Sequence, residues 1–490
     1  MMTGLIRSSN DLRRLCRRVN STALLLLLGL MLPAAQAKDA SALALSEKIE
    51  EGHYLARAAD CTACHTRPGS NLEFAGGYPI ISPLGVIYSS NITPSKIAGI
   101  GNYSEAQFAN ALRNGIRADG AHLYPAMPYT SYSQLKDEDI HSLYLYFMHG
   151  VVAVDNVPPQ TALPFPFNIR SSMLGWNLLF LKKGPFIDNP DHSEAINRGA
   201  YLSQTLAHCS VCHTPRNVLM AEQDDKLFTG AALAGWHAPN ITSDPVSGIG
   251  GWSDAELVSY LQTGVAQGKA RAGGGMAEVV EDSLQYLKTE DISAIVSYLR
   301  TIPPIRSAQD RKSAFSFGQP SSSEATLRGL SAINASDSLN NGAALFSSNC
   351  SSCHQPDGRG SNNQAFPPLF NSSTTGGSHN GEANNLVATI LFGVDRNVGG
   401  TQVFMPGFGT QSAVNALSDQ QIALIANHVS REFGDPTLQI SAEQVALIRA
   451  GGAPPLLARV QPYLALLLIG ALMLLGLVSV VLYRRRRRPH

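Results

Sequence analysis

Six of the seven cysteines in this chain of 490 residues fall in three copies of the pattern Cys-x-x-Cys-His, which read CTACH, CSVCH and CSSCH. The cysteines are Cys61, Cys64, Cys209, Cys212, Cys350 and Cys353, and the histidines are His65, His213 and His354. Two thiols at this spacing lie on one face of a helical turn, so each can form a thioether with a vinyl group of haem. The following histidine then directs its imidazole to the iron. The pattern therefore predicts three covalently bound haem c groups.

Two other kinds of chemistry use closely spaced cysteines. Structural zinc requires four ligands, usually from two CxxC pairs, and the three motifs leave no spare cysteine for such a site. Thiol–disulfide exchange does not require a histidine directly after the second cysteine. The seventh cysteine, Cys16, lies in a segment that we expect to be removed. The pattern therefore favours haem attachment over both alternatives.

The sixth ligand of each iron decides what the haem can do. A methionine completes an electron-transferring iron, whereas an open position indicates catalysis or gas binding. One methionine follows each motif at a comparable distance, 62 residues after His65, 63 after His213 and 51 after His354. The predicted sixth ligands are Met127, Met276 and Met405. We expect all three to lie in loops before the last helix of their copy.

Three residues compete with these methionines. Met148 falls in a helical pattern and is expected in the core, as most methionines are. Met220 is the second candidate in copy two, and His122 is a minor alternative in copy one. The glycines before Met276, in RAGGGMAEVV, are expected to let the backbone approach the haem closely.

The segments around the motifs predict the helices that must position them. Before each motif comes a glycine and then a tyrosine or phenylalanine, in EEGHYLARAADCTACH, NRGAYLSQTLAHCSVCH and NNGAALFSSNCSSCH. This spacing predicts a helix packed tightly, at the glycine, against another helix. Each copy ends in a second helical pattern with a side-chain N-cap signal, at residues 135–147, 287–300 and 417–429. The first cysteines are 148 and 141 residues apart, from 61 to 209 and from 209 to 350, so the copies have the size of domains.

Copies one and two also share a stretch that begins Asn-Ile-Thr, at residues 91–93 and 240–242. The triplet matches the acceptor sequence for N-glycosylation. Because it recurs in register within the repeat, we expect a structural role instead.

Both ends of the chain carry targeting signals. Five arginines in residues 1–20, a short apolar run and an Ala-Gln-Ala site predict a signal peptide cleaved after Ala37. A retained N-terminal anchor is less favoured because the apolar run is short for a membrane span. Residues 463–483 lack any charge and precede five successive arginines, which predicts a transmembrane helix with a cytoplasmic tail. We therefore expect everything before residue 462 to lie outside the cytoplasm.

Each copy resembles a class I cytochrome c domain, and the whole layout is similar to the tri-haem cytochrome c subunit of bacterial membrane-bound dehydrogenases. The resemblance covers about residues 45–435 and depends most on the three CxxCH motifs with their methionines. It implies His65, His213 and His354 as proximal ligands and Met127, Met276 and Met405 as distal ligands. Unlike several members of that family, which bind the membrane through amphipathic surfaces, this chain has an explicit C-terminal span.

The expected fold is mainly α-helical, with three tandem cytochrome c domains and one C-terminal transmembrane helix. The expected segments are a signal peptide (1–37), domain 1 (38–155), a connector (156–185), domain 2 (186–305), a linker (306–330), domain 3 (331–436), a tether (437–461), the transmembrane helix (462–483) and a basic tail (484–490). The apolar part of the connector is expected to pack between units, although contact with a partner or the membrane surface stays open.

The resemblance implies that electrons pass from a dehydrogenase subunit of the flavin, pyrroloquinoline-quinone or molybdenum type to ubiquinone or a terminal oxidase. We find no flavin or nicotinamide fingerprint, so we expect no substrate-oxidising site in this chain itself. The alternatives are a cytochrome subunit of an oxidase or another respiratory complex, and a haem enzyme with an open iron. The 37 basic and 37 acidic residues balance, so nothing indicates a nucleic-acid partner.

Overall fold

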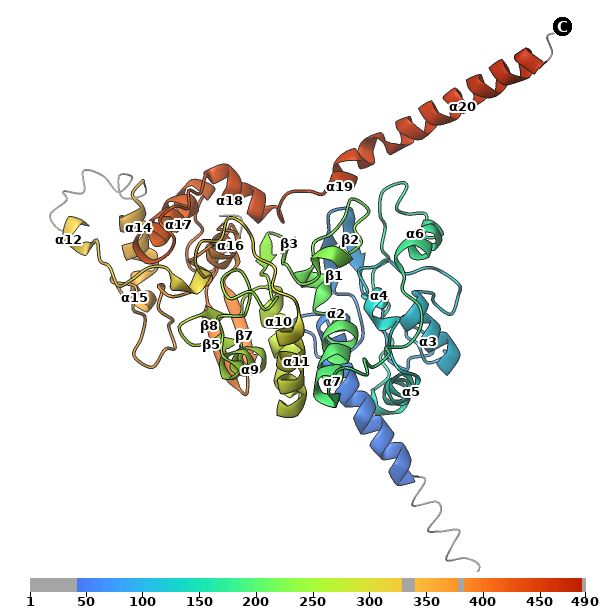
Figure 1. Ribbon diagram of the computed structural model, residues 1–490, viewed down its shortest axis with the longest axis horizontal. Helices are drawn as coiled ribbons and strands as arrows, with labels where there is room; N and C mark the ends of the chain where they lie inside the picture. Colours follow the sequence, from blue (N-terminus) through green and yellow to red (C-terminus); the bar gives the residue numbers. More distant parts are fainter. Residues whose placement is uncertain (1–41, 328–339, 378–382, 487–490) are drawn as a thin grey trace, which may run out of the picture.

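The computed structural model describes residues 42–327, 340–377 and 383–486. The expected signal peptide, Cys16 and the last residues of the basic tail, 487–490, lie outside the described residues. The described chain is mainly helical, with four short two-stranded antiparallel sheets, β1–β2, β3–β4, β5–β6 and β7–β8. Figure 1 shows three units side by side in chain order, unit one (42–155) on the right, unit two (186–305) in the middle and unit three (340–449) on the left.

Unit one begins with a helix over residues 42–58. Its other elements are α2 (Cys61–His65), β1 (Pro79–Ser82), β2 (Gly85–Tyr88), α3 (Glu105–Asn114), α4 (Tyr129–Tyr132), α5 (Asp137–Leu145) and the π-helix η1 (Tyr146–Gly150). The connector that follows forms α6 (Ser172–Phe180).

Unit two is the central part of the molecule. Its elements are α7 (Glu194–Tyr201), η2 (Leu202–Leu206), α8 (Ser210–His213), η3 (Asp224–Lys226), β3 (Ala231–Leu233), β4 (Trp236–Ala238), α9 (Asp254–Thr263), β5 (Val265–Ala266), β6 (Ala270–Arg271), α10 (Gly275–Asp282), η4 (Leu284–Tyr286) and α11 (Thr289–Thr301). The linker to unit three carries η5 (Ala314–Ser316) and α12 (Glu324–Leu327).

Unit three precedes the C-terminal helices. Its elements are α14 (Gly342–Asn349), α15 (Ser351–His354), α16 (Asn384–Phe392), β7 (Val394–Val398), β8 (Thr401–Met405), α17 (Asp419–Phe433) and α18 (Ala442–Arg449). The chain then continues through α19 (Leu456–Val460), η6 (Gln461–Tyr463) and α20 (Leu464–Arg486).

The same helix crossing occurs in all three units, at the glycine that precedes each motif. A Cβ atom added at Gly52 would collide with the carbonyl oxygen of Ser142 in α5. In unit two, a Cβ atom at Gly199 would collide with the carbonyl oxygen of Ala294 in α11. In unit three, a Cβ atom at Gly342 would collide with the carbonyl oxygen of Leu424 in α17. The absence of a side chain lets the two backbones approach this closely.

The hydrophobic cores do not follow the three units one by one. Units one and two share a continuous cluster of buried side chains, which includes Leu55 and Phe147 from one and Tyr201 and Val280 from the other. Unit three has its own cluster around Phe346, with Trp236 of unit two packed against it. Units one and two are therefore more intimately joined to each other than either is to unit three.

The last helices of units one and two lack the expected side-chain N-caps. Lys136 and Lys288 occupy the N-cap positions of α5 and α11 and make no capping hydrogen bond. The first turns of both helices carry acidic residues, whose charge is favourable at the positive end of a helix. Only α17 has the expected cap, a capping box formed by Ser418 and Gln421.

The Asn-Ile-Thr stretches of units one and two are buried structural turns. Asn91 Oδ1 accepts hydrogen bonds from the amide and the hydroxyl of Thr93, and Asn240 accepts the same pair from Thr242. Asn91 is 3 % exposed and Asn240 is 5 % exposed. The side-chain amide of Asn91 donates a hydrogen bond to Val154 O near the end of unit one. That of Asn240 donates one to Ile305 O at the end of unit two. This burial supports the structural role expected from the repeat.

Part of the segment expected as a tether belongs to unit three. Within residues 437–461, Leu438, Ile440, Val445 and Ile448 are buried in the core of unit three. Arg449 also forms an ion pair with an Asp419 oxygen at 2.7 Å. Only tertiary packing shows that α18 belongs to unit three and which surface its apolar residues cover.

The connector helix α6 lies against units one and two. Asn177 Oδ1 accepts a 2.8 Å hydrogen bond from the hydroxyl of Tyr129, and Trp176 Nε1 donates one of 2.9 Å to Leu219 O. The connector thus bridges two units, as expected. Three of its leucines, Leu174, Leu178 and Leu179, stay exposed.

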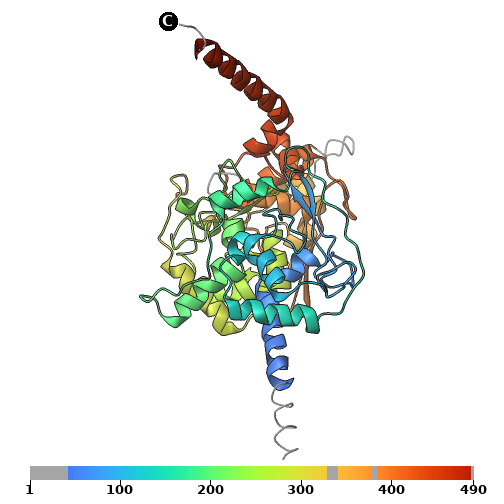
Figure 2. The ribbon, with the colours of Figure 1, turned by 90° about the vertical axis from the view of Figure 1, so that its right-hand side faces the viewer.

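The C-terminal helix projects from the body of the molecule, on the side opposite to the start of the first helix (Figures 1 and 2). Within the described residues no single helix has the length and apolar composition to cross a membrane. Two helical segments, Leu456–Leu467 and Ile469–Tyr483, meet these criteria together, with a bend of 42° between them.

Candidate functional site

One continuous cavity of about 1440 Å³ runs through all three units. It exceeds the roughly 300–1,000 Å³ that is typical of a site for one small molecule. Its lining includes every cysteine and histidine of the three motifs and all three predicted methionines. The structure therefore brings together the twelve residues that the sequence singled out, four from each unit.

The three motif histidines are held in the same way. Nδ1 of His65 lies 2.7 Å from Ser90 O, that of His213 lies 2.7 Å from Pro239 O, and that of His354 lies 2.9 Å from Pro367 O. A carbonyl oxygen only accepts, so each Nδ1 carries the proton and Nε2 of the neutral ring has the lone pair. A backbone carbonyl on the second ring nitrogen is the usual partner of a metal-ligating histidine.

Burial shifts the pKa values of the three motif histidines and of several motif thiols toward the neutral forms. It lowers the pKa of His65, His213 and His354, so their imidazoles are neutral at neutral pH. It also raises the pKa of the Cys212 thiol, and it raises the pKa of Cys61, Cys64, Cys209 and Cys350 to about 12. All six motif cysteines are free of disulfides.

The motifs of units one and two lie close together. Burial raises the pKa of Cys64 most, followed by the charges of Asp60 and Glu278. The charge of Cys212 in the second motif raises it further. His208, directly before the second motif, packs the edge of its ring against Tyr132 of unit one, with ring centroids 5.7 Å apart. Sequence reasoning did not single out either of these two residues, because nothing local shows that they meet.

Only one of the three methionines lies in a loop. Met127 does, just before α4, whereas Met276 is in the first turn of α10 and Met405 is the last residue of β8. The expectation of three loops was therefore wrong for two units. Both elements lie at the contact between units two and three, where α10 packs against β7, the strand paired with β8.

A sequence signal for these methionines does exist and was missed. In each unit a helix ends at a glycine with positive φ, Gly115 (62°), Gly264 (71°) or Gly393 (75°). The methionine comes twelve residues later in every case, from 115 to 127, from 264 to 276 and from 393 to 405. The chain between them makes an antiparallel turn, as a single bridge in unit one and as β5–β6 and β7–β8 in the others. The spacing from glycine to methionine is the same in all three units, whereas the spacing from histidine to methionine varies from 51 to 63 residues.

The glycines before Met276 line the cavity at Gly273 and Gly275, and two of them also lie against a tryptophan ring. A Cβ atom at Gly274 would lie 2.6 Å from Cε2 of the Trp236 indole, and one at Gly273 would lie 3.5 Å from the same ring. These glycines therefore admit Trp236, whose ring also packs against Phe392 of unit three.

The weaker candidates lie elsewhere. None of Met148, Met220 and His122 lines the cavity. Met148 packs against the core shared by units one and two, and the carbonyl of Met220 accepts a hydrogen bond from Arg216.

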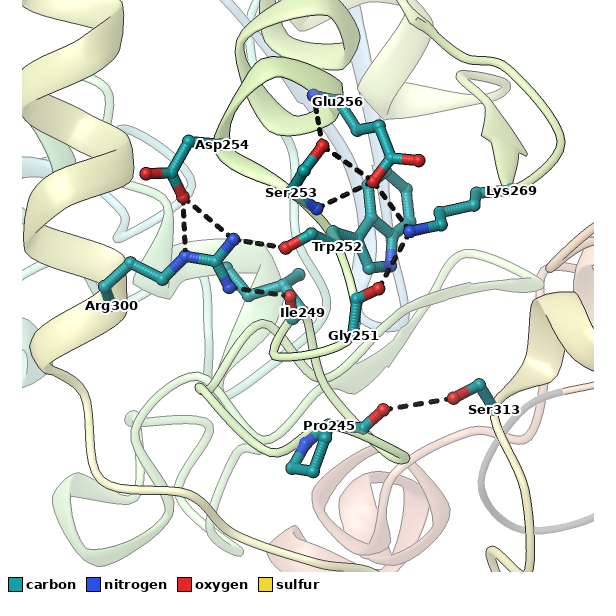
Figure 3. Close-up of polar contacts among 10 residues, drawn as sticks. All are labelled: Pro245, Ile249, Gly251, Trp252, Ser253, Asp254, Glu256, Lys269, Arg300 and Ser313. Carbon is teal, nitrogen blue, oxygen red and sulfur yellow. Dashed lines mark hydrogen bonds and ion pairs between the residues drawn. The ribbon is translucent and has the colours of Figure 1, made fainter.

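A polar network holds the wall of the cavity in unit two (Figure 3). Arg300 of α11 binds Asp254 at the start of α9 and donates to the carbonyl groups of Ile249 and Trp252. Lys269 binds Glu256 at 2.6 Å and Gly251 O at 2.8 Å. Ile249, Trp252 and Lys269 line the cavity, so this network fixes one wall of the second site.

Comparison with known proteins agrees with this geometry. The family model for cytochrome c matches residues 339–431, a range that covers most of unit three. The chain is 46% identical over 476 residues to the fructose dehydrogenase cytochrome subunit of Gluconobacter japonicus, covering 95% of this chain and 97% of the relative.

The chain belongs to the family of dehydrogenase cytochrome c subunits. It is also 36% identical over 439 residues to the gluconate 2-dehydrogenase cytochrome c subunit of Pantoea cypripedii, covering 87% and 94% of the two chains. Identity to the cytochrome c subunit of the alcohol dehydrogenase (quinone) of Gluconobacter oxydans is 35% over 435 residues, covering 86% and 85%. An electron-transfer role and covalently bound haem c follow from membership of this family.

The residues of this cytochrome subunit fit haem c. Each unit offers two free thiols, an imidazole with an unprotonated Nε2 and a thioether sulfur, all on the lining of one cavity. When bound, haem supplies a one-electron couple at iron. The chain supplies the attachment points, orients the imidazoles through Ser90, Pro239 and Pro367, and surrounds the group with apolar side chains that exclude water.

Proposed function

We propose that this chain is a membrane-anchored periplasmic electron carrier with three haem c groups. It passes electrons from a dehydrogenase subunit to ubiquinone or a terminal oxidase. The observation that carries the proposal is the continuous cavity lined by all three CxxCH motifs and by three methionines. A connected cavity keeps the redox centres close together, as a relay requires.

The proposed axial pairs are His65 with Met127, His213 with Met276, and His354 with Met405. The tautomer of each histidine supports the proximal role, because the carbonyl bond to Nδ1 leaves Nε2 available. The positions of the methionines on the cavity lining support the distal role. With both axial positions filled, the irons suit electron transfer better than catalysis.

The proposed location is the bacterial inner membrane, with the haem-binding units in the periplasm. The apolar C-terminal segments and the arginines after them support an anchor at this end. The start of the first described helix faces away from α20, which supports removal of residues 1–37 over retention of a second anchor there (Figure 2).

The substrate of the complex belongs to the partner. The relatives are cytochrome subunits of fructose, gluconate and alcohol dehydrogenases, so one type of electron carrier serves several substrates. We therefore propose a dehydrogenase partner of the flavin, pyrroloquinoline-quinone or molybdenum type.

The test is purification of the chain from detergent-solubilised membranes, followed by mass spectrometry. The expected result is an intact mass with three haem groups and a dehydrogenase subunit at near-equal amount. Co-purification with oxidase subunits alone would instead favour the respiratory-complex alternative. A mature chain with fewer than three haems would contradict the proposed cofactor content, and one iron that binds carbon monoxide as isolated would favour a haem enzyme.

A further inference from the structure

Two arginines, one buried and one partly buried, lie where units two and three meet, on the lining of the cavity. Arg396, on β7 of unit three, is 1 % exposed. Arg271, on β6 of unit two, is partly buried. Neither residue takes part in an ion pair of 4 Å or less within the described residues.

The guanidinium of Arg396 has unused hydrogen-bond donors. Its Nη1 donates a 2.6 Å hydrogen bond to Ala272 O, but Nε and Nη2 have no partner although both atoms are buried. The group is also packed against the turn after α9, because a Cβ atom at Gly264 would lie 2.6 Å from Cζ of Arg396. A buried cation with two unsatisfied donors is expensive, and an anion bound to those donors would remove this cost.

Arg271 adds a second positive charge to the same region. Its Nη2 donates a 2.9 Å hydrogen bond to Gln364 O of unit three. Burial lowers its pKa, and the charge of Arg396 lowers it further, so the two guanidinium groups are near enough to repel each other. Burial lowers the pKa of Arg396 and the charge of Glu281 acts in the opposite direction, but the two side chains do not form an ion pair. Both arginines stay protonated, because a guanidinium does not lose its proton in proteins.

The pair lies between the second and third methionine sites. Arg396 is opposite Val403 in the hairpin that ends at Met405. Arg271 precedes Met276 by five residues and its charge reaches His354 of unit three. An anion held here must therefore reach the space between the predicted haem sites of units two and three.

We propose that Arg396 and Arg271 bind carboxylates of haem propionate groups at the boundary between units two and three. This inference rests on the proposed haem sites. Haem carries two propionates, and a guanidinium with free Nε and Nη2 donors matches a carboxylate in a two-bond geometry. The site uses one arginine from each unit, so it joins the two units through the cofactor.

The charge pair also sets the redox balance of the nearest iron. A cation that neutralises a propionate favours the ferrous form, because the ferric form carries one more positive charge. Replacement of the arginine leaves the propionate charge uncompensated, which favours ferric iron and lowers the midpoint potential.

The test uses the full chain purified with its haems, in the variants R396Q, R271Q and the control R359Q. Arg359 is an exposed residue of unit three that pairs with Asp357 and does not line the cavity. Potentiometric titration is expected to show that one haem in R396Q has a lower midpoint potential. The expected shift corresponds to about a tenfold change in the ferric-to-ferrous ratio, which is 59 mV for one electron. R271Q is expected to shift in the same direction, and R359Q is expected to match the unsubstituted chain.

Resonance Raman spectra of the propionate bending modes separate contact from distant charge. A changed mode in R396Q or R271Q supports direct binding. Lowered potentials with unchanged modes, or three haems with unchanged potentials in both variants, would overturn the inference and leave the proposed function standing. If R396Q does not assemble, R271Q decides, because its arginine is less buried. Fewer than three haems in the unsubstituted chain would overturn the proposed function instead.

Discussion

The hydroxyl of Tyr54 donates a 2.6 Å hydrogen bond to Oδ2 of Asp291, and this bond joins the first helix of unit one to α11 of unit two. The same carboxylate accepts bonds from Arg198, of 2.8 Å from Nε and 2.7 Å from Nη2. Burial by itself would raise the pKa of Asp291, but the bonds from Arg198 and Tyr54 outweigh it and the pKa lies below its ordinary value. The ionised carboxylate therefore contributes to the junction of the two units.

The D291N variant is expected to unfold more easily than the unsubstituted chain, by roughly 2 kcal/mol at pH 7. Because the pKa in the folded chain is lowered, this stability is present above the unfolded pKa of about 3.9 and is lost as the pH falls through the folded pKa. Denaturant titrations of the haem-loaded chain at several pH values measure it. The Y54F variant, which keeps Arg198, should lose less. A difference between D291N and the unsubstituted chain that stays constant down to acidic pH would contradict this reading.

Alanine at Gly52 or Gly199 is expected to destabilise the chain by about 1–3 kcal/mol, the usual effect of overpacking. The added methyl group would meet a carbonyl oxygen of the crossing helix, which cannot move without shifting α5 or α11. Thermal unfolding measures the loss. Gly175 in α6 is the matched control, because a Cβ atom there meets nothing within 4 Å. G175A should gain about 0.5–1 kcal/mol, so equal effects at all three positions would refute the role of the crossing.

Replacement of Met127, Met276 or Met405 by alanine is expected to remove the thioether ligand of one iron. The charge-transfer absorption band between methionine sulfur and ferric iron should weaken in each variant, and the midpoint potential of one haem should fall. M148L is the control, since Met148 does not line the cavity. An unchanged band in M276A would exclude Met276 as a ligand and reopen the assignment in unit two.

Serine at both Cys209 and Cys212 is expected to leave a chain with two covalent haems. Intact mass spectrometry counts them directly. The same double substitution at Cys350 and Cys353 should give the same count, because the two sites bind independently of each other's thioethers. Retention of three covalent haems in either variant would show that another side chain attaches the group.

The sequence determined the chemistry of the sites. Attachment of haem depends on side chains within five consecutive residues, so the spacing of Cys61, Cys64 and His65 is enough to predict it. The glycine crossings were predictable for the same reason, since a glycine before the motif repeats at a local spacing. Unit three also had a local signal for α17, the capping box at Ser418, which the structure retains.

Tertiary structure alone decided how the sites are joined. Arg271 and Arg396 are far apart in the sequence, and only the packing of β7 against unit two places their charges together without a carboxylate. Trp236 explains the glycines before Met276 for a similar reason, because its ring arrives from another hairpin. Motif spacing acts within one helical turn, whereas these contacts depend on how three units pack, which no short stretch of sequence specifies.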